Sequence, residues 1–185
     1  AIPLWQRAGE LALQRMAMTE AIAHLNQGLD LIAALPQSSE RDASELGLRS
    51  LLGTAWMALN GWPAPEVWTS LHPALALAKL TDRYDTMLPI LWGLYLNVMT
   101  QGRVAESLPW AQEMLDVAEA TGDSDLLIAG STAACVSYAW LGEFTKAIEH
   151  GDRVLHLYDA ERHRYLADFL LHDPQTLAYS FASIS

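Results

Sequence analysis

Histidines and aspartates crowd the last quarter of the chain, and these residue types bind metal ions and transfer protons. The group comprises His150, His156, His163, His172, Asp152, Asp159, Asp168 and Asp173. A metal site needs its ligands at a defined spacing, such as the two helical histidines around a glutamate in metalloproteases. That spacing does not occur here, and the group is divided between a helical segment and a link. We therefore predict that the chain holds no metal ion.

The one cysteine, Cys135, lies in a run of small residues from Ser131 to Val136. A catalytic cysteine needs a histidine and an orienting acid beside it, whereas a run of small residues is typical of closely packed helices. We expect Cys135 to be buried. A single cysteine also excludes an internal disulfide and a cysteine-based zinc site, which fits a reducing compartment, and we expect a cytoplasmic protein.

Two pairs of carboxylates, Glu10 with Glu20 and Asp123 with Asp125, have the residue types of acid–base catalysis. Glu20 and Asp123 stand at expected helix starts, where the helix dipole favours a negative charge, so capping explains them better. The sequence contains no glycine-rich loop that ends in Gly-Lys-Ser or Gly-Lys-Thr. We predict no catalytic residue, no nucleotide site and no cofactor, and therefore no enzyme.

The composition restricts the class of partner. Of 185 residues, 51% are hydrophobic and 18% are charged, which is enough apolar material for a folded core. Twenty-two acidic residues against eleven basic ones give a formal charge of -11, which argues against nucleic acid and anionic membranes. No apolar run reaches the roughly 18 to 20 residues that span a bilayer. Because the sequence starts at Ala1 and stops at Ser185 within an expected helix, we expect a fragment of a longer protein.

The elements that must position these residues are helices. Apolar residues such as Leu25, Leu29 and Ile32 recur at helical spacing, and the two-residue alternation of strands is missing. Turn-forming residues divide the chain into segments of about 14 to 20 residues. Because short links favour antiparallel neighbours, we predict an all-α fold built from helical hairpins.

Several links carry residues that begin or end helices. Thr19 is expected to cap a helix that begins at Glu20, and Asp173 one that begins at Pro174. Pro109 is expected to interrupt a helix, because only the first turn tolerates proline. Three glycines suit the left-handed position that follows a helix: Gly102, Gly122 and Gly142.

The sequence also repeats itself. Residues 21–31 match residues 147–157 at five positions, and two further segments share a four-and-three spacing of small and apolar residues. These segments are Val67-Leu71-Ala74 and Val104-Leu108-Ala111. The four segments predict four equivalent second helices of a repeat array.

Two groups of residues resemble the tetratricopeptide repeat. The first is Trp5, Ala8, Gly9, Ala12, Ala21, Leu25, Gly28 and Ala33; the second is Tyr138, Leu141-Gly142-Glu143-Phe144 and Ala147. The resemblance implies one domain that forms a right-handed superhelix of hairpins, with repeats at 1–36, 38–80, 82–121 and 123–158 and a partial fifth at 160–185. The displaced Pro36 and the enlarged link at residues 60–65 depart from the pattern.

The resemblance assigns two kinds of role. Small and apolar residues pack the paired helices: Trp5, Gly9, Ala21, Leu25, Gly28, Val67, Leu71, Ala74, Val104, Leu108, Ala111 and Ala147. Others face a binding groove: Gln6, Glu10, Leu13, Gln14, Asn97, Thr132, Val136 and Trp140. The Lys, Asn and Arg set with which one subclass of these repeats grips a terminal carboxylate is missing, so a hydrophobic or amphipathic segment is the expected ligand. Most of the seven tryptophans are expected in the core.

A narrower resemblance rests on six segments taken together. They are 5–9, 20–25, 64–67, 91–94, 157–159 and 172–174, which read WQRAG, EAIAHL, APEV, LWGL, LYD and HDP. They are similar to the repeat region of large bacterial signalling proteins that join a class III adenylate/guanylate cyclase, a signal-transduction ATPase and a repeat array. This resemblance implies a regulatory fragment whose partner is a protein segment or a flanking domain of the same chain. The alternative is an inducer- or partner-binding arm of a transcriptional regulator.

The last expected helix presents apolar residues that a following helix would cover in a longer array. They are Leu177, Tyr179, Phe181 and Ile184. Because terminal repeats need a polar outer face, we expect this end to fray, to fold back on the preceding repeat, or to form a homodimer.

Overall fold

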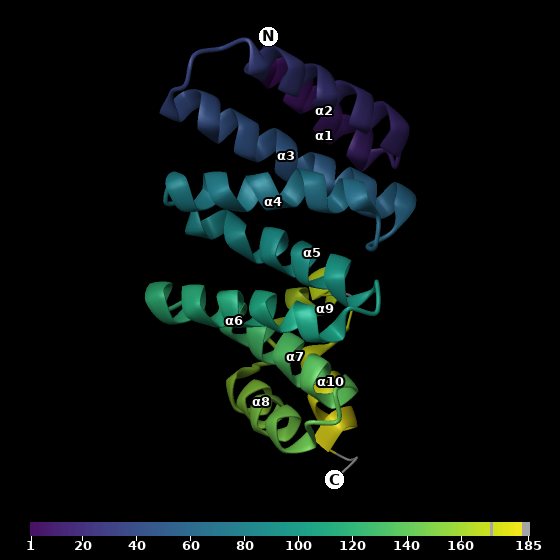
Figure 1. The fold of residues 1–185 in the computed structure, drawn as a ribbon, viewed down its shortest axis with the longest axis vertical. Coiled ribbons are helices and arrows are strands. Elements are labelled where there is room, and N and C mark those ends of the chain that lie inside the picture. The colour runs from purple at the N-terminus through teal and green to yellow at the C-terminus, as the bar shows by residue number, and fades with distance from the viewer. Residues whose placement is uncertain (171, 183–185) are drawn as a thin grey trace. The chain divides into compact units, whose positions relative to one another are not determined.

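The computed structural model describes residues 1–170 and 172–182, and it is all-helical over these residues (Figure 1). Its helices pack as sequential antiparallel pairs, which confirms the predicted all-α fold class. The helices are α1 (Ile2–Gln14), α2 (Met18–Ala33), α3 (Ser39–Asn60), α4 (Pro65–Leu80), the 3-10 turn η1 (Tyr84–Thr86), α5 (Met87–Met99), α6 (Val104–Thr121), α7 (Ser124–Trp140), α8 (Phe144–Leu157), α9 (Arg164–Leu170) and α10 (Pro174–Ala182). Among the described residues, none of these helices is both long and apolar enough to cross a bilayer.

The chain forms two compact units, residues 1–97 and residues 98–185, and the boundary falls inside α5. We call them the first unit and the second unit.

Helices of the first unit approach closely where one of them carries a glycine. A Cβ atom on Gly9 of α1 would lie 2.6 Å from Cδ2 of Leu25 in α2. One on Gly53 of α3 would lie 2.3 Å from Cδ2 of Leu71, and one on Gly93 of α5 would lie 2.4 Å from Cδ1 of the same leucine. Leu71 of α4 therefore fills a space that two glycines leave open.

Helix α7 is the centre of the second unit. It packs against α6, α8 and α10, and every residue from Ile128 to Cys135 is buried. This middle part of α7 has no face left for solvent, which suits its small residues.

Residues with a positive φ angle follow helices in both units. Gly102, Gly122 and Gly142 have φ angles of 78°, 72° and 79°, which confirms the positions predicted for them. In the first unit, Gly61 follows α3 with a φ of 82°, while Met16 (φ 61°) and Asp82 (φ 53°) adopt positive φ angles although they carry side chains. Left-handed backbone costs such residues about 1–2 kcal/mol relative to glycine.

Two local predictions were wrong. Helix α2 begins at Met18, one residue before Thr19, and no side chain caps it. Helix α6 continues through Pro109, because both this residue and Ala105 are exposed, so water can bind the carbonyl that loses its partner. The cap at Asp173 is confirmed, since its Oδ1 accepts a hydrogen bond of 2.8 Å from the Thr176 N–H.

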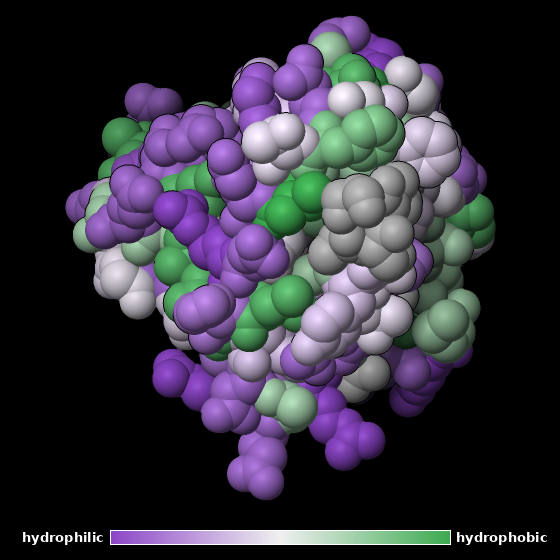
Figure 2. Space-filling model, turned by 90° about the horizontal axis from the view of Figure 1, so that it is seen from below, coloured by the Kyte–Doolittle hydropathy of each residue, from purple (hydrophilic) through white to green (hydrophobic). Residues whose placement is uncertain are grey.

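Helix α10 packs on α8 and α7. Tyr179 is 58% exposed and Leu177 is half-buried, whereas the side chain of Phe181 and the whole of Ile184 lie outside the described residues. Seen from below, hydrophobic residues lie among hydrophilic ones on this end (Figure 2). Self-association through this end stays a prediction.

Candidate functional site

A groove of about 420 Å³ opens between α1, α3 and the start of α5 in the first unit. We call it the α1–α3 groove. It is lined by Gln6, Glu10, Ala43, Leu46, Gly47, Ser50, Leu51, Arg83, Asp85, Thr86 and Pro89. Apolar side chains therefore alternate with groups that donate or accept hydrogen bonds.

The charged side chains of the groove are paired. Glu10 accepts hydrogen bonds of 3.2 Å from both Gln6 Nε2 and Arg7 Nη1. Arg83 donates from Nε and Nη2 to the two carboxylate oxygens of Asp85, each at 2.8 Å. This hydrogen bonding raises the pKa of Arg83 and lowers the pKa of Asp85. The groove is therefore close to neutral, which favours an uncharged or amphipathic occupant.

A second hollow of about 420 Å³ shares Ala43 and Arg83 with the α1–α3 groove. Ser39, Asp42, Leu80 and Thr81 complete its lining. Arg83 lines both hollows, and its exposed guanidinium is held by the two hydrogen bonds to Asp85.

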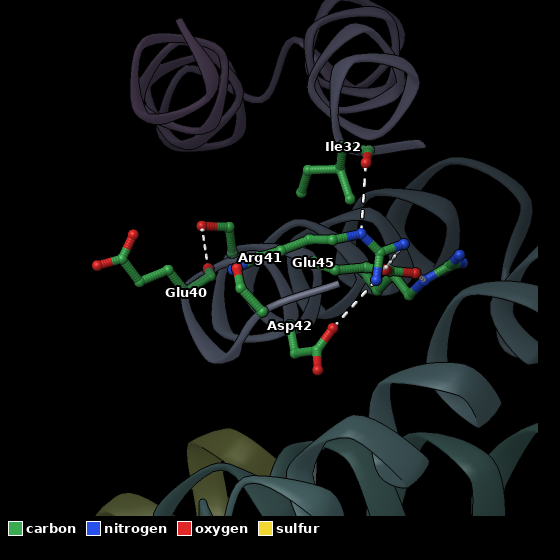
Figure 3. Close-up of polar contacts among 8 residues, drawn as sticks. Ile32, Glu40, Arg41, Asp42 and Glu45 are labelled. Carbon is green, nitrogen blue, oxygen red and sulfur yellow. Dashed lines mark hydrogen bonds and ion pairs between the residues drawn. The ribbon is translucent and has the colours of Figure 1, made fainter. Parts of the chain in front are cut away.

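A polar network fixes the start of α3, which carries one wall of the groove (Figure 3). Arg41 Nε donates to the backbone carbonyl of Ile32 in α2 at 3.4 Å. Its two terminal nitrogens reach Asp42 at 3.0 Å and Glu45 at 3.2 Å, and Arg49 Nε donates to Glu45 at 2.7 Å. These side chains are half-buried, and they tie the end of α2 to the first two turns of α3.

Of the groove residues expected in the first repeat, Gln6 and Glu10 line the α1–α3 groove. Leu13 packs instead against the hydrophobic core formed by α1, α2 and α3. Gln14 is exposed at the end of α1 and does not line the groove.

Two expected groove residues are buried, and for them the expectation was wrong. Asn97 is 1% exposed, and its amide donates to the backbone carbonyls of Trp62 at 2.7 Å and Ala64 at 2.9 Å. Thr132 is 2% exposed and donates to the Ile128 carbonyl within its own helix. Asn97 holds the enlarged link between α3 and α4, and Thr132 lies within the enclosed helix α7.

The remaining expected groove residues belong to the second unit. Val136 is half-buried, whereas Trp140 is 70% exposed. Trp140 lines a separate hollow of about 330 Å³ at the turns before α6 and after α7. Arg103 and Glu106 form an ion pair in the same hollow.

Most residues assigned to helix packing are buried. They are Gly9, Ala21, Leu25, Gly28, Val67, Leu71, Ala74, Ala111 and Ala147. The other three are half-buried: Trp5, Val104 and Leu108.

The tryptophans are less buried than expected. Trp92 is 5% exposed, and Trp140 is the exposed one described above. The other five are half-buried: Trp5, Trp56, Trp62, Trp68 and Trp110. An indole has a large surface and one N–H group, so full enclosure is uncommon.

Sequence reasoning missed the part of the groove that comes from α3 and from η1. Ala43, Gly47 and Ser50 recur at helical spacing, and a glycine inside a helix usually marks a close approach. At Gly47 a Cβ atom would lie 3.3 Å from Gln6 Nε2. Gly47 could therefore have indicated a close approach at this part of the groove, whereas Arg83 and Asp85 lie in a link without a repeat pattern.

Conspicuous titratable residues have structural roles. Burial raises the pKa of the Cys135 thiol to about 11, and its burial was predicted. His163 Nδ1 accepts the Asp159 N–H at 2.9 Å, and Asp123 caps α7 by accepting the backbone N–H groups of Asp125 and Leu126. Within residues 1–170 and 172–182, no three His, Cys, Asp or Glu residues gather as metal ligands; the Asp168 side chain lies outside the described part.

Comparison with known protein families and with curated proteins finds no match. Among solved structures, the crystal structure of the apo form of RapI matches with a TM-score of 0.80 and 12% sequence identity. The match covers 98% of this chain and 64% of that one, so the chain spans just under two thirds of the RapI chain. At this identity the likeness concerns the fold alone: this chain is a helical repeat protein with the tetratricopeptide-like arrangement of RapI.

Proposed function

We propose that this chain is a non-catalytic interaction module that binds a segment of a partner protein in the α1–α3 groove. The open groove of about 420 Å³ on the first unit carries this proposal. The fold shared with RapI agrees with it, because helical repeats present extended surfaces to their ligands.

The lining of the groove determines the chemistry of the ligand. Leu51 and Pro89 offer apolar contact, while Ser50 and Thr86 offer hydroxyl groups. Both hydroxyls donate within the chain, to the carbonyls of Leu46 and Arg83, and keep their acceptor lone pairs. An amphipathic segment with one apolar edge and nearby N–H donors fits this surface.

A peptide of about 12 residues, roughly three helical turns, built from Leu, Gln and Ser with the leucines on one face, tests the proposal. It should bind the purified chain, and a scrambled peptide of equal composition should not. Ser50→Trp fills the groove and should weaken binding about tenfold or more, the loss of one anchoring contact.

Thr69→Trp on α4 is the matched control. Thr69, like Ser50, donates its hydroxyl to a backbone carbonyl of its own helix, but it does not line the groove. Thr69→Trp should leave the affinity unchanged. Equal affinities of the two tryptophan variants, or no binding of the peptide, would contradict the proposal.

We propose further that the module regulates a bacterial signalling protein that contains cyclase and ATPase domains. The sequence resemblance of segments such as 20–25 and 91–94 supports this assignment. The coding sequence on either side of this segment tests it: a nucleotide cyclase upstream would support it, and a helix-turn-helix domain would favour the transcriptional regulator instead.

The absence of catalysis in this chain is likewise our proposal. Its support is that Cys135, His163 and Asp123 serve packing and capping. Hydrolysis or cyclisation of a nucleotide by the pure chain would refute it.

A further inference from the structure

The side-chain amide of Gln6 has a fixed orientation in the α1–α3 groove. Its Nε2 donates to Glu10 Oε1 at 3.2 Å. A carboxylate can only accept hydrogen bonds, so the amide must turn its nitrogen to Glu10 and its carbonyl oxygen away from it. Glu10 is held in turn by Arg7, whose Nη1 donates to Oε2 at 3.2 Å. The ion pair of Arg7 and Glu10 therefore sets the direction of the Gln6 carbonyl.

Helix α3 comes close to the same amide at Gly47. The Cβ position of Gly47 lies 3.3 Å from Gln6 Nε2 and 3.4 Å from Gln6 Oε1. A residue with a side chain at this position would press on the amide, whereas glycine leaves room for it. Within the described part of the chain, Gln6 Oε1 accepts no hydrogen bond, although Gln6 lines the groove. The groove thus contains a well-oriented acceptor that a ligand can use.

The rest of the lining also accepts more hydrogen bonds than it donates. Ser50 and Thr86 donate their hydroxyl protons to backbone carbonyls of the chain and keep only acceptor lone pairs. Asp85 and Glu10 are carboxylates, each already paired with an arginine. Arg83 donates from Nε and Nη2 to Asp85. A ligand with N–H donors would satisfy these acceptors, whereas a ligand with further acceptors would leave them unpaired.

We infer that Gln6 is a specificity-determining residue of the α1–α3 groove, and that it selects a partner segment with a side-chain carboxamide against one with a carboxylate. A ligand carboxamide donates an N–H to Gln6 Oε1. A carboxylate of the same shape would bring its charge against the Gln6 carbonyl and Glu10. Groups left unpaired in this way discriminate strongly between isosteres. The inference rests on the proposed function, because it requires a protein segment in this groove.

The charges of the groove favour a neutral donor over a cationic one. Each of the two carboxylates, Glu10 and Asp85, already has an arginine partner. A ligand lysine would lose part of its hydration without gaining an unpaired carboxylate in return. A carboxamide has a smaller desolvation cost, because it is uncharged.

A scan of the Leu, Gln and Ser peptide tests this selection. Each glutamine in turn is replaced by glutamate or by lysine, and the affinities are compared with that of the parent peptide. At one position, glutamate should weaken binding to the wild type about tenfold or more, and Gln6→Met should reduce this ratio to about threefold or less. The formal charge of -11 repels the glutamate peptides in both proteins alike, so the change in the ratio isolates Gln6.

Gln14→Met is the matched control. Gln14 lies on the same helix, is exposed and does not line the groove, so this variant should keep the wild-type ratio. If Gln6 only supported the fold, Gln6→Met would weaken all peptides by one factor and leave the ratio unchanged. That result would overturn the inference and leave the proposed function intact. Failure of the parent peptide to bind would contradict both.

Reversing the selection is a stricter test. Gln6→Lys replaces the carbonyl acceptor with an ammonium group that has three donors, of which Glu10 can use one. This variant should bind the glutamate peptide at least as tightly as the parent peptide, whereas Gln14→Lys, which adds the same charge outside the groove, should keep the wild-type order. An unreversed order in Gln6→Lys, or tighter binding of a lysine peptide than of the parent by the wild type, would contradict the inference.

Discussion

The two units differ in how much of their helices the rest of the same unit covers. In the first unit, α1 and α3 leave the α1–α3 groove open, and Gln6 and Glu10 lie in it. In the second unit, α7 is enclosed from Ile128 to Cys135; of the residues expected to face a groove, Thr132 is buried and Val136 half-buried, and only Trp140 at the end of the helix is exposed. Similar helical pairs can thus leave a groove open or form a core, depending on what packs against them.

The largest expected effect concerns the packing that both units share. Leu71→Ala would remove a buried side chain that fills the space beside Gly53 and Gly93, and should lower the free energy of unfolding by about 2–5 kcal/mol. Leu115→Ala beside Gly130 is the counterpart in the second unit and should fall in the same range of about 2–5 kcal/mol. Urea denaturation measures both. A loss below about 1 kcal/mol at Leu71 would contradict this account of the packing.

The next effect separates structural residues from binding residues. Asn97→Ala would remove the amide donor from the Trp62 carbonyl and leave the Ala64 carbonyl with the Val67 N–H alone, and should destabilise the chain by about 2 kcal/mol. Thr132→Val removes only a bond within its own helix and should cost less than about 1 kcal/mol. Neither variant should change peptide affinity in the α1–α3 groove. If a folded Asn97→Ala variant bound the peptide more weakly, Asn97 would be a groove residue after all.

A smaller effect comes from the turns. Gly122→Ala in the second unit forces a side chain into a φ of 72° and should cost about 1 kcal/mol. Met16→Gly in the first unit relieves the same strain at a φ of 61° and should add about 0.5–1 kcal/mol. Thermal or urea unfolding measures the change in stability for both variants. A destabilised Met16→Gly variant would show that the methionine side chain stabilises the fold by more than its left-handed backbone destabilises it.

The smallest effect is a pH dependence confined to the second unit. Burial, followed by the hydrogen bond to Asp125, raises the pKa of Tyr165 from its usual 10.0 to about 12. A raised pKa means that the folded state favours the neutral phenol. Its contribution to stability is therefore complete below pH 10 and is lost as the pH rises towards 12. The ultraviolet absorbance of tyrosinate follows this ionisation, and Tyr165→Phe should remove the highest-pKa step; an unchanged titration curve would contradict the assignment.

The sequence predicted the fold because its signals are local. Helical spacing, the glycines that end helices and the cap at Asp173 act within a few residues of one another. Leu25 and Ala21 are buried where the repeat resemblance puts them. The interior Pro109 misled the prediction, because a proline on the exposed side of a helix loses one bond that water replaces.

The site was predicted only in part because exposure depends on distant segments. Gln6 and Glu10 follow from their place on α1, but the opposite wall at Arg83 and Thr86 comes from a link without a repeat pattern. Thr132 was expected to face a groove, yet it is buried, because burial depends on what packs against α7 from elsewhere in the second unit. The spacing of residues within α7 does not indicate whether another part of the chain packs against them.

Amide chemical shifts in the presence of the Leu, Gln and Ser peptide test the central claim most directly. If the α1–α3 groove is the binding surface, shifts should concentrate at residues around Gln6, Gly47, Ser50 and Thr86. The amides of α7 from Asp125 to Val136 should stay where they are. Shifts confined to α7, or spread evenly over both units, would contradict the assignment of function to the first unit.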